Sequence, residues 1–230
     1  MPYNKISIVI PTYNEKDNIA KLIPEIFSQI GCEIIVVDDN SPDGTAGVVE
    51  GLAKKYNVKL IKRKGKLGIG SAYKAGFESA SGDIIFEMDA DFSHDPKHIK
   101  DFVQAIGNCD AVVGSRYIKG GTVVGWGFYR KAVSRTANFL AHFFLRIPVN
   151  DVTSGYRAYR KSALKKIDIE RIKSEGYSFQ LEILHYMVKA GLRINEIPII
   201  FNDRRIGKSK LGKKEIFNFA RTVLRLLAKG

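Results

Sequence analysis

The sequence has few cysteines, a shortage of acidic residues and no long apolar run. Its two cysteines, Cys32 and Cys109, stand in apolar or strand-edge contexts without metal-site spacing. This pattern excludes a disulfide framework and indicates small core residues of a reducing compartment. No stretch approaches the roughly 18 consecutive apolar residues of a spanning helix, so we expect any membrane contact to be peripheral. Residues 1–5 lead straight into a predicted strand, so we expect no signal peptide.

Basic residues greatly outnumber acidic ones. The chain has 37 Lys and Arg against 24 Asp and Glu, a net charge of +13 in 230 residues. Such an excess predicts a polyanionic partner, which is nucleic acid, anionic lipid or a phosphorylated substrate. A basic nucleic-acid-binding protein is one interpretation. It leaves the acidic clusters described below unexplained, and no recognised nucleic-acid module is present.

Short apolar runs alternate with amphipathic segments through the first half of the chain. The runs contain no alternating polar positions, as expected for strands covered on both faces. This alternation predicts an α/β fold with a mostly parallel central sheet and helices on both faces. The predicted strands are 5–10, 33–38, 58–62, 83–88, 111–116 and 194–202; the predicted helices are 16–30, 44–56, 70–80, 96–106, 128–147, 176–190 and 213–229. We expect one domain over residues 1–230.

Polar residues gather where four predicted strands end. Ligands of such sheets bind outside the carboxyl ends of the strands, so these residues should meet at one edge. The four clusters are Thr12–Glu15, Asp38–Asp39, Asp89–Asp91 and Ser115–Arg116.

Asp89 and Asp91 close one apolar run and predict a metal site. In an extended strand, residues i and i+2 point the same way, and two adjacent carboxylates repel unless a cation lies between them. Mg²⁺ and Mn²⁺ prefer carboxylate, water and phosphate oxygen, which indicates a nucleotide-linked donor. The alternative is a strand-end turn, which Asp also favours. Gly65–Gly70 fits neither a phosphate-binding nor a dinucleotide loop and is interpreted as a tight turn near the site.

Several motifs together resemble glycosyltransferase family 2, whose fold is the Rossmann-like GT-A fold. Pro11–Glu15, Val36–Asp39 and Asp89–Asp91 carry this resemblance. Further motifs resemble the branch of the family that transfers mannose to a polyprenyl phosphate: Gly114–Tyr117, Tyr129–Lys131, Asp151–Arg157 and Ser209–Gly212. The resemblance runs from about Lys5 to the C-terminus. It implies a nucleotide-sugar half over 1–117 and an acceptor half over 118–230, with amphipathic helices at about 128–147 and 213–229.

The resemblance implies inverting transfer of mannose from GDP-mannose to dolichyl or another polyprenyl phosphate, dependent on Mg²⁺ or Mn²⁺. Asp89 and Asp91 would hold the metal, with Ser93 as a further ligand where relatives often have glutamine. The implied donor-binding residues are Pro11, Tyr13, Glu15, Asp38, Asp39, Asp89, Arg204 and Lys210. A UDP-sugar such as UDP-glucose remains an alternative donor. A partner-binding subunit with an inactive transferase domain is a further alternative, which the presence of both Asp89 and Asp91 opposes.

The implied acceptor needs cations rather than a base. Many relatives carry a Glu-Asp pair on a late helix, whereas Phe179–Glu182 lacks it. A phosphomonoester has a second pKa near ~6 and is already ionised at neutral pH. Arg116, Arg130 and Ser134 are the expected acceptor-phosphate ligands, and Asp91, Arg116, Arg130 and Lys210 the expected catalytic residues. The alternative is that Arg116 and Arg130 pair with core acids.

Two segments predict contact with an anionic membrane surface at its cytoplasmic face. In 128–147, a polar stripe of Lys131, Arg135, Asn138, His142 and Arg146 accompanies an otherwise apolar surface, and 213–229 repeats this plan. Apolar faces flanked by basic residues suit helices lying in the interface of a bilayer. The alternative is packing on the domain's own core. Helix 213–229 could instead dock on a small membrane-spanning partner.

Overall fold

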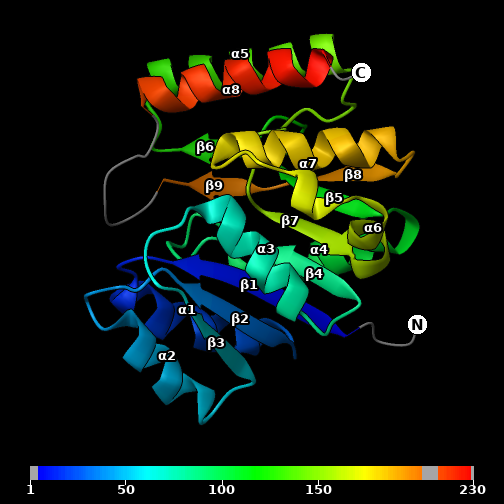
Figure 1. The fold of residues 1–230 in the computed structure, drawn as a ribbon. Helices are drawn as coiled ribbons and strands as arrows, with labels where there is room; N and C mark the ends of the chain where they lie inside the picture. The colour runs from blue at the N-terminus through cyan, green and yellow to red at the C-terminus, as the bar shows by residue number, and fades with distance from the viewer. Residues whose placement is uncertain (1–4, 204–211, 229–230) are drawn as a thin grey trace.

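A seven-stranded sheet forms the centre of the computed structural model, which describes residues 5–203 and 212–228 (Figure 1). The strand order is β3-β2-β1-β4-β7-β5-β8. β7 runs antiparallel to both of its neighbours, and the other six strands share one direction. The strands are β1 Ile6–Thr12, β2 Glu33–Asp38, β3 Val58–Lys62, β4 Ile84–Glu87, β5 Ala111–Ser115, β7 Arg157–Arg160 and β8 Ile194–Pro198.

Helices cover both faces of this sheet and enclose two apolar cores. Successive side chains of a strand point to opposite faces, so Ile8 and Val9 of β1 enter different cores. Tyr73 of α3 and Phe179 of α7 pack with Val9, while Phe102 of α4 packs on the Ile8 side. The helices are α1 Lys16–Gln29, α2 Thr45–Ala53, α3 Ile69–Ser79, α4 Ile99–Ala105, α5 Phe128–Leu145, α6 Lys161–Lys166, α7 Tyr177–Lys189 and α8 Lys213–Leu227.

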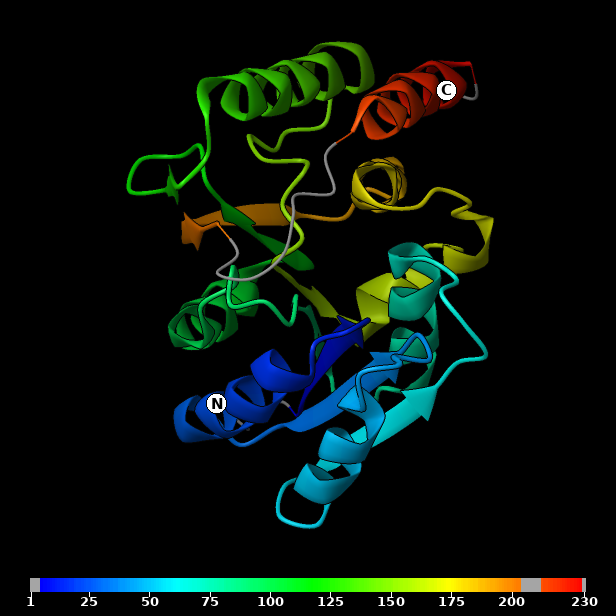
Figure 2. The same ribbon diagram turned by 90° about the vertical axis from the view of Figure 1, so that its left-hand side faces the viewer.

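α5 and α8 lie side by side as an outer layer beyond α7, at one end of the molecule (Figures 1 and 2). The inward face of α5 carries Ser134, Asn138, Ala141 and Leu145, which recur at helical spacing. A short parallel ribbon of β6 (Thr122–Val124) and β9 (Ile200–Asn202) lies below this layer. Within residues 5–203 and 212–228, no helix combines the length and apolar character that crossing a membrane requires.

The structure differs from the sequence-based prediction of the fold in several respects. The predicted strand 194–202 divides into β8 and β9, because residues 194–198 pair with β5 and residues 200–202 pair with β6. β7 was not predicted, since its end residues Arg157 and Arg160 are charged. Asn138 is buried rather than part of an exposed stripe, and its side chain accepts a hydrogen bond from the Val152 N–H at 2.9 Å.

Candidate active site

The four polar clusters do lie at one edge of the sheet. They follow β1, β2, β4 and β5, and these strands run in the same direction. The edge is therefore the place where ligands of an open α/β sheet bind. The individual side chains differ in what they do there.

Asp38 holds two loops together and faces away from solvent. It is 1% exposed. Its Oδ1 accepts from the hydroxyls of Thr12, at 2.9 Å, and Ser41, at 2.6 Å, while Oδ2 accepts from the Ser41 N–H at 2.9 Å. Its carboxylate joins the end of β1 to the loop after β2, and the predicted contact of Asp38 with a nucleoside stays a prediction beside this structural role.

Asp39 forms an ion pair with a neighbouring arginine. Arg63, which follows β3, forms an ion pair with Asp39 and donates to the Gly68 carbonyl at 2.8 Å and to Ser71 Oγ at 2.5 Å. The Gly65–Gly70 segment is thereby fastened beside the site. Its Lys66 lies over the ring of Tyr13, with Nζ 4.3 Å from the ring centre.

Two of the other expected nucleotide ligands of the β1 loop are accessible or partly so. Tyr13 is 36% exposed, and Pro11 is half-buried at the end of β1. Glu15 accepts from the Asn18 side chain at 2.7 Å. Sequence reasoning missed Lys66, although a lysine in a glycine loop beside a predicted strand end could have indicated it.

Asp89 and Asp91 lie beyond the strand, which corrects the alternation argument. β4 ends at Glu87, and a turn with Phe92 at a φ of 62° carries the two carboxylates. Asp91 is buried and accepts from both the N–H and the hydroxyl of Ser93, at 3.1 and 2.5 Å. The side chain of Asp89 is 34% exposed and accepts from the Tyr73 hydroxyl at 3.3 Å.

His94 positions this turn. Burial lowers the pKa of His94, and its Nδ1 accepts from the Asp89 N–H at 2.9 Å, so the ring is neutral with its proton on Nε2. The ring stacks on Tyr156 with centroids 4.8 Å apart. The interpretation of His94 as structural therefore agrees with its contacts.

The residues of the turn fit a partly protein-held divalent metal. No group of three or more His, Cys, Asp or Glu side chains in residues 5–203 and 212–228 is arranged to hold an ion. Mg²⁺ usually takes one or two carboxylates and completes its shell with water and substrate phosphates. Asp89 and Asp91 match that donor set. Ser93, the expected third ligand, instead donates its hydroxyl hydrogen to Asp91.

A further acid, in addition to Asp89 and Asp91, lies at the end of β4, and the sequence analysis did not predict its role. Glu87, the last residue of β4, is fully buried near Arg157, Tyr159 and Gln180. Burial raises the pKa of Glu87 to about 7, against the opposing effect of Arg157. The sequence analysis did not single out Glu87, because it lies within an apolar run that was interpreted as an ordinary buried strand.

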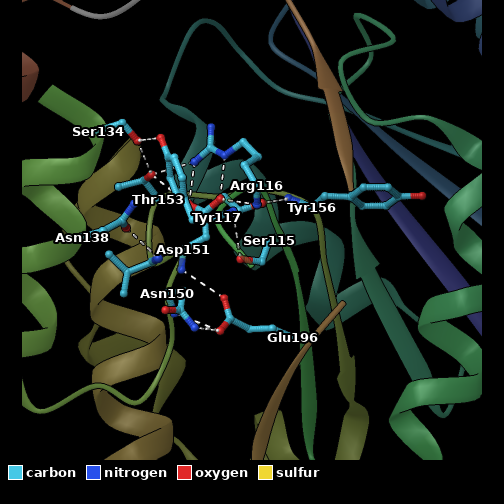
Figure 3. Close-up of polar contacts among 12 residues, drawn as sticks. Ser115, Arg116, Tyr117, Ser134, Asn138, Asn150, Asp151, Thr153, Tyr156 and Glu196 are labelled. Carbon is cyan, nitrogen blue, oxygen red and sulfur yellow. Dashed lines mark hydrogen bonds and ion pairs between the residues drawn. The ribbon is translucent and has the colours of Figure 1, made fainter. Parts of the chain in front are cut away.

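Arg116 forms a buried ion pair and is not an exposed phosphate ligand (Figure 3). Its Nε and Nη2 donate to the two Asp151 oxygens at 2.6 Å each, and Nη2 also donates to Thr153 Oγ1 at 2.7 Å. The residue is 4% exposed. The alternative interpretation, pairing with a core acid, therefore describes Arg116, whose charge positions the segment around Asp151.

Arg130 lies nearer the surface and retains hydrogen-bonding capacity. Its Nη1 donates to Asp203 at 2.9 Å, and the guanidinium stacks 3.9 Å from the Trp126 ring centre. Its Nε is buried without a hydrogen-bond partner among the described residues. Buried charged donors are rarely left unsatisfied, so this atom marks a place for an acceptor oxygen.

An apolar groove of about 280 Å³ opens beside Arg130, between α5 and α8. Ser134 lies at its inner wall, where it accepts from the Tyr117 hydroxyl at 2.8 Å and lies 3.3 Å from Thr153 Oγ1 (Figure 3). The sides of the groove are apolar and comprise Val133, Ala137, Leu140, Ile216, Phe219 and Ala220. The groove therefore has apolar sides and a polar end, where Arg130, Ser134 and Thr153 lie.

Of the two acids near the start of α7, exposed Glu175 precedes the helix and accepts from the N–H groups of Gly70 and Ser71. Glu182 of α7 is buried and pairs with Arg225 at 2.8 Å, and its Oε2 also accepts from the Ser174 N–H. Phe179 and Gln180 are buried as well. Two expected donor ligands, Arg204 and Lys210, lie outside the described residues.

Comparisons with known proteins identify the family of the chain. The family model described as glycosyl transferase family 2 matches residues 7–168. A polyprenol monophosphomannose synthase from Mycolicibacterium smegmatis is 37% identical over 222 positions, which cover 94% of this chain and 84% of that protein. A dolichol-phosphate mannosyltransferase from Pyrococcus furiosus is 40% identical over 230 positions, which cover 97% of this chain and 64% of that protein. The chain thus spans less than two thirds of the second relative.

Solved structures share the fold. Glucosyl-3-phosphoglycerate synthase from Mycobacterium tuberculosis, in complex with Mn²⁺, UDP and glucosyl-3-phosphoglycerate, has a TM-score of 0.69 at 20% identity, covering 99% of this chain and 80% of that one. A mannosyltransferase from Pyrobaculum calidifontis, in complex with GDP-Man and Mn²⁺, has a TM-score of 0.64 at 16% identity, covering 98% and 64%. At these identities the likeness shows the fold alone, and the predicted GT-A fold is confirmed.

Proposed function

The chain belongs to glycosyl transferase family 2, and we propose that it transfers mannose from GDP-mannose to dolichyl or another polyprenyl phosphate, with inversion at the sugar. Family membership makes it a glycosyltransferase. The single observation that carries the acceptor assignment is the unpartnered Nε of Arg130 at the polar end of the α5–α8 groove. A polyprenyl phosphate has the matching shape, an anionic head on an apolar chain. The names of the two curated relatives support the same acceptor class.

Arg130 is the acceptor-phosphate ligand in this proposal, with Ser134 beside it. Arginine binds phosphate through parallel N–H bonds, and Nε is the donor that still lacks an acceptor. Stacking on Trp126 fixes the plane of the guanidinium before the acceptor arrives. Arg116 acts through Asp151 and Thr153 by holding the polar end of the groove in place.

The reaction needs positioning more than proton transfer. The ionised phosphate oxygen attacks the anomeric carbon of mannose while the bond from that carbon to GDP breaks, which gives a β-linked lipid phosphosugar from an α-linked donor. Glu182 is buried and held by Arg225, and Phe179–Glu182 carries no Glu-Asp pair, which suits a nucleophile that is already deprotonated. Orientation of donor and acceptor can supply a large part of the acceleration.

In this proposal, the nucleotide sugar binds on the side of the site formed by the loops after β1, β3 and β4. Tyr13 offers an exposed ring to the base, and Lys66 lies over that ring with a positive charge. Asp89 and Asp91 would hold Mg²⁺ or Mn²⁺, which when bound neutralises the charge of the departing diphosphate. The binding of GDP-Man and Mn²⁺ by a neighbour of the same fold motivates this assignment.

The outer surface of the α5–α8 layer suits peripheral contact with a membrane, at its cytoplasmic face in our proposal. Large apolar side chains are exposed there, and an apolar patch of this kind marks an interaction surface. They are Phe128, Tyr129, Phe139, Phe143, Phe144, Phe217, Leu224 and Leu227. Helical spacing places exposed Arg135 on the outer flank of α5 and exposed Arg221 on the outer flank of α8. A lipid acceptor would enter the groove between the two helices.

The test is sugar transfer to a short-chain polyprenyl phosphate with a panel of nucleotide sugars, with and without Mn²⁺. We expect lipid-linked mannose from GDP-mannose only, with β configuration by NMR. Preferential use of UDP-glucose would overturn the donor assignment and keep the acceptor. Transfer to a soluble hydroxyl acceptor, with none to the lipid phosphate, would overturn the acceptor assignment.

A further inference from the structure

A second cavity, separate from the acceptor groove, lies between α7, α8 and the segment that precedes α7. Its volume is about 310 Å³ and its walls are polar. Lys173 and Ser174 line it from the segment, Ser178 from α7, and Arg221 and Arg225 from α8. Nothing in the proposed sugar transfer uses these residues.

The two acids at this cavity already have partners. Glu175 accepts from the N–H groups of Gly70 and Ser71, at 2.7 and 3.2 Å, and so caps the first turn of α3. Glu182 pairs with Arg225 at 2.8 Å. Glu175 keeps its negative charge at the cavity, but among the described residues no ion pair joins either carboxylate to Lys173 or Arg221, and the three cations Lys173, Arg221 and Arg225 outnumber the two acids.

Lys173 and Arg221 are the cations of the cavity that remain beside Arg225. Neither has an ion-pair or hydrogen-bond partner among the described residues. The cavity also holds unused polar atoms. Within the part of the chain that the structure describes, the hydroxyl of Ser178, a residue only 2% exposed, has no hydrogen-bond partner, and neither does the buried Nε of Arg225. An excess of cations over acids, together with these donors, favours a bound anion with several acceptor oxygens, such as a phosphate.

The position of the cavity indicates where that phosphate comes from. Arg221 lies on the flank of α8 between the cavity and the outward face, where Phe217 and Leu224 are 68% and 67% exposed. An anionic phospholipid could therefore place its phosphate at Arg221 while its acyl chains lie along Phe217 and Leu224. A free phosphate would make no use of these side chains.

We propose that the cavity between α7 and α8 is a binding site for the phosphate of an anionic membrane phospholipid, distinct from the acceptor groove. The site would fix the rotation of α8 on the membrane, which diffuse attraction between basic residues and lipid cannot do. This inference rests on the proposed membrane contact of the α5–α8 layer.

The test measures binding of the full chain to vesicles of phosphatidylcholine alone and of phosphatidylcholine with phosphatidylglycerol, with no nucleotide or polyprenyl phosphate present. Arg221→Gln is compared with Arg135→Gln, which removes one exposed charge from the opposite flank of the same layer. We expect Arg221→Gln to weaken binding to the anionic vesicles about tenfold more than Arg135→Gln. Ser178→Ala, which changes no charge, should weaken it severalfold.

Equal losses for Arg221→Gln and Arg135→Gln, with no effect of Ser178→Ala, would show diffuse attraction only and overturn the site. Full competition by inorganic phosphate against the unaltered chain and Arg135→Gln, at concentrations that leave the residual binding of Arg221→Gln unchanged, would show a free-phosphate site and overturn the lipid source. If the unaltered chain bound neither kind of vesicle, the membrane contact in the proposed function would fail together with this inference. Hydrogen exchange offers a second measurement: anionic vesicles should protect amides 173–178 in the unaltered chain and not in Arg221→Gln.

Discussion

Arg116 and Asp151 meet in a buried bidentate ion pair, with Nε–Oδ2 and Nη2–Oδ1 both at 2.6 Å. The Arg116 N–H also donates to Asp151 at 3.0 Å, so a single carboxylate fixes both the backbone and the side chain at the end of β5. A pair of this kind is costly to break, because the remaining partner keeps a charge inside the protein.

Asp151→Asn should lower the free energy of unfolding by about 3–5 kcal/mol, since it leaves the Arg116 guanidinium without its counter-charge. Urea unfolding followed by circular dichroism measures this. Glu196→Gln is the control, because Glu196 accepts only from groups of Asn150 and the Asp151 N–H at the surface of the same region. A loss for Asp151→Asn no larger than that of the control would contradict the prediction.

The same pair predicts a component of acid unfolding. Burial by itself raises the pKa of the Asp151 carboxyl, but Arg116 and the hydrogen bonds from Arg116 and Thr153 outweigh burial and hold that pKa below its ordinary value of 3.8. The folded state then binds fewer protons than the unfolded state. The stabilisation is present above pH 3.8 and is lost as the pH falls through that value towards the lower folded pKa.

Unfolding free energies measured across this acid range should therefore fall less steeply for Asp151→Asn than for the unaltered chain. Other carboxylates with lowered pKa, such as Glu33 and Asp43, contribute to both curves equally. Identical slopes for the two proteins would mean that Asp151 is not held ionised by Arg116.

Arg116 shows how much of the candidate site could be predicted from the sequence. Strand ends and residue types placed the right polar clusters at the right edge, because parallel strands bring their carboxyl ends together. The partner of each side chain was out of reach, since it lies far along the chain: Asp151 for Arg116, Arg63 for Asp39. The interpretation of Arg116 changed for this reason, and Asp39 has a partner that the sequence did not indicate.

The fold, like the site, could be predicted in part from the sequence. The bounds of apolar runs were found to the residue for buried β2 and for partly exposed β3. β7 was missed because Arg157 is fully buried despite its charge, and its guanidinium donates to the carbonyls of Ser154, Gln180 and Val152 at 2.7–2.8 Å. A search for runs of hydrophobic residues misses a strand that contains a buried arginine, because the hydrogen bonds that stabilise the buried charge are visible only in the folded structure.

Asp91→Ala should abolish Mn²⁺-dependent turnover and leave the fold intact. Asp91 and Asp89 are the proposed metal carboxylates, and an alanine leaves one acid for an ion that usually takes one or two plus phosphate oxygens. Turnover titrated with Mn²⁺, beside a thermal melt, measures both effects. Ser93→Ala keeps the carboxylate and removes only its hydroxyl partner, so it should reduce turnover much less. Undiminished turnover in Asp91→Ala would remove that residue from the metal site.

Arg130→Ala should impair use of the lipid phosphate more than binding of the nucleotide. Hydrogen bonds to charged groups contribute about 1.5–3 kcal/mol, so kcat/KM for the acceptor should fall about tenfold to a hundredfold. Titration calorimetry with GDP and Mn²⁺ gives the donor side. Arg135→Ala removes an exposed charge from the same helix outside the groove and should leave both quantities closer to those of the unaltered chain. Equal losses in acceptor use and GDP affinity for Arg130→Ala would move Arg130 out of the acceptor site.

Two helical glycines should respond to alanine with opposite signs. A Cβ at Gly76 of α3 would overlap Val9 Cγ1 of β1 and lie 3.0 Å from Cγ2, so Gly76→Ala should overpack the core and cost about 1–3 kcal/mol of unfolding free energy. At Gly47 of α2 nothing lies within 4 Å, and Gly47→Ala should gain about 0.5–1 kcal/mol because alanine loses less backbone entropy on folding. Chemical denaturation measures both. A double-mutant cycle with Val9→Ala isolates the contact: the smaller side chain should relieve most of the Gly76→Ala penalty and none of the Gly47→Ala gain. If Val9→Ala left that penalty unchanged, the close approach of α3 to β1 would not be its cause.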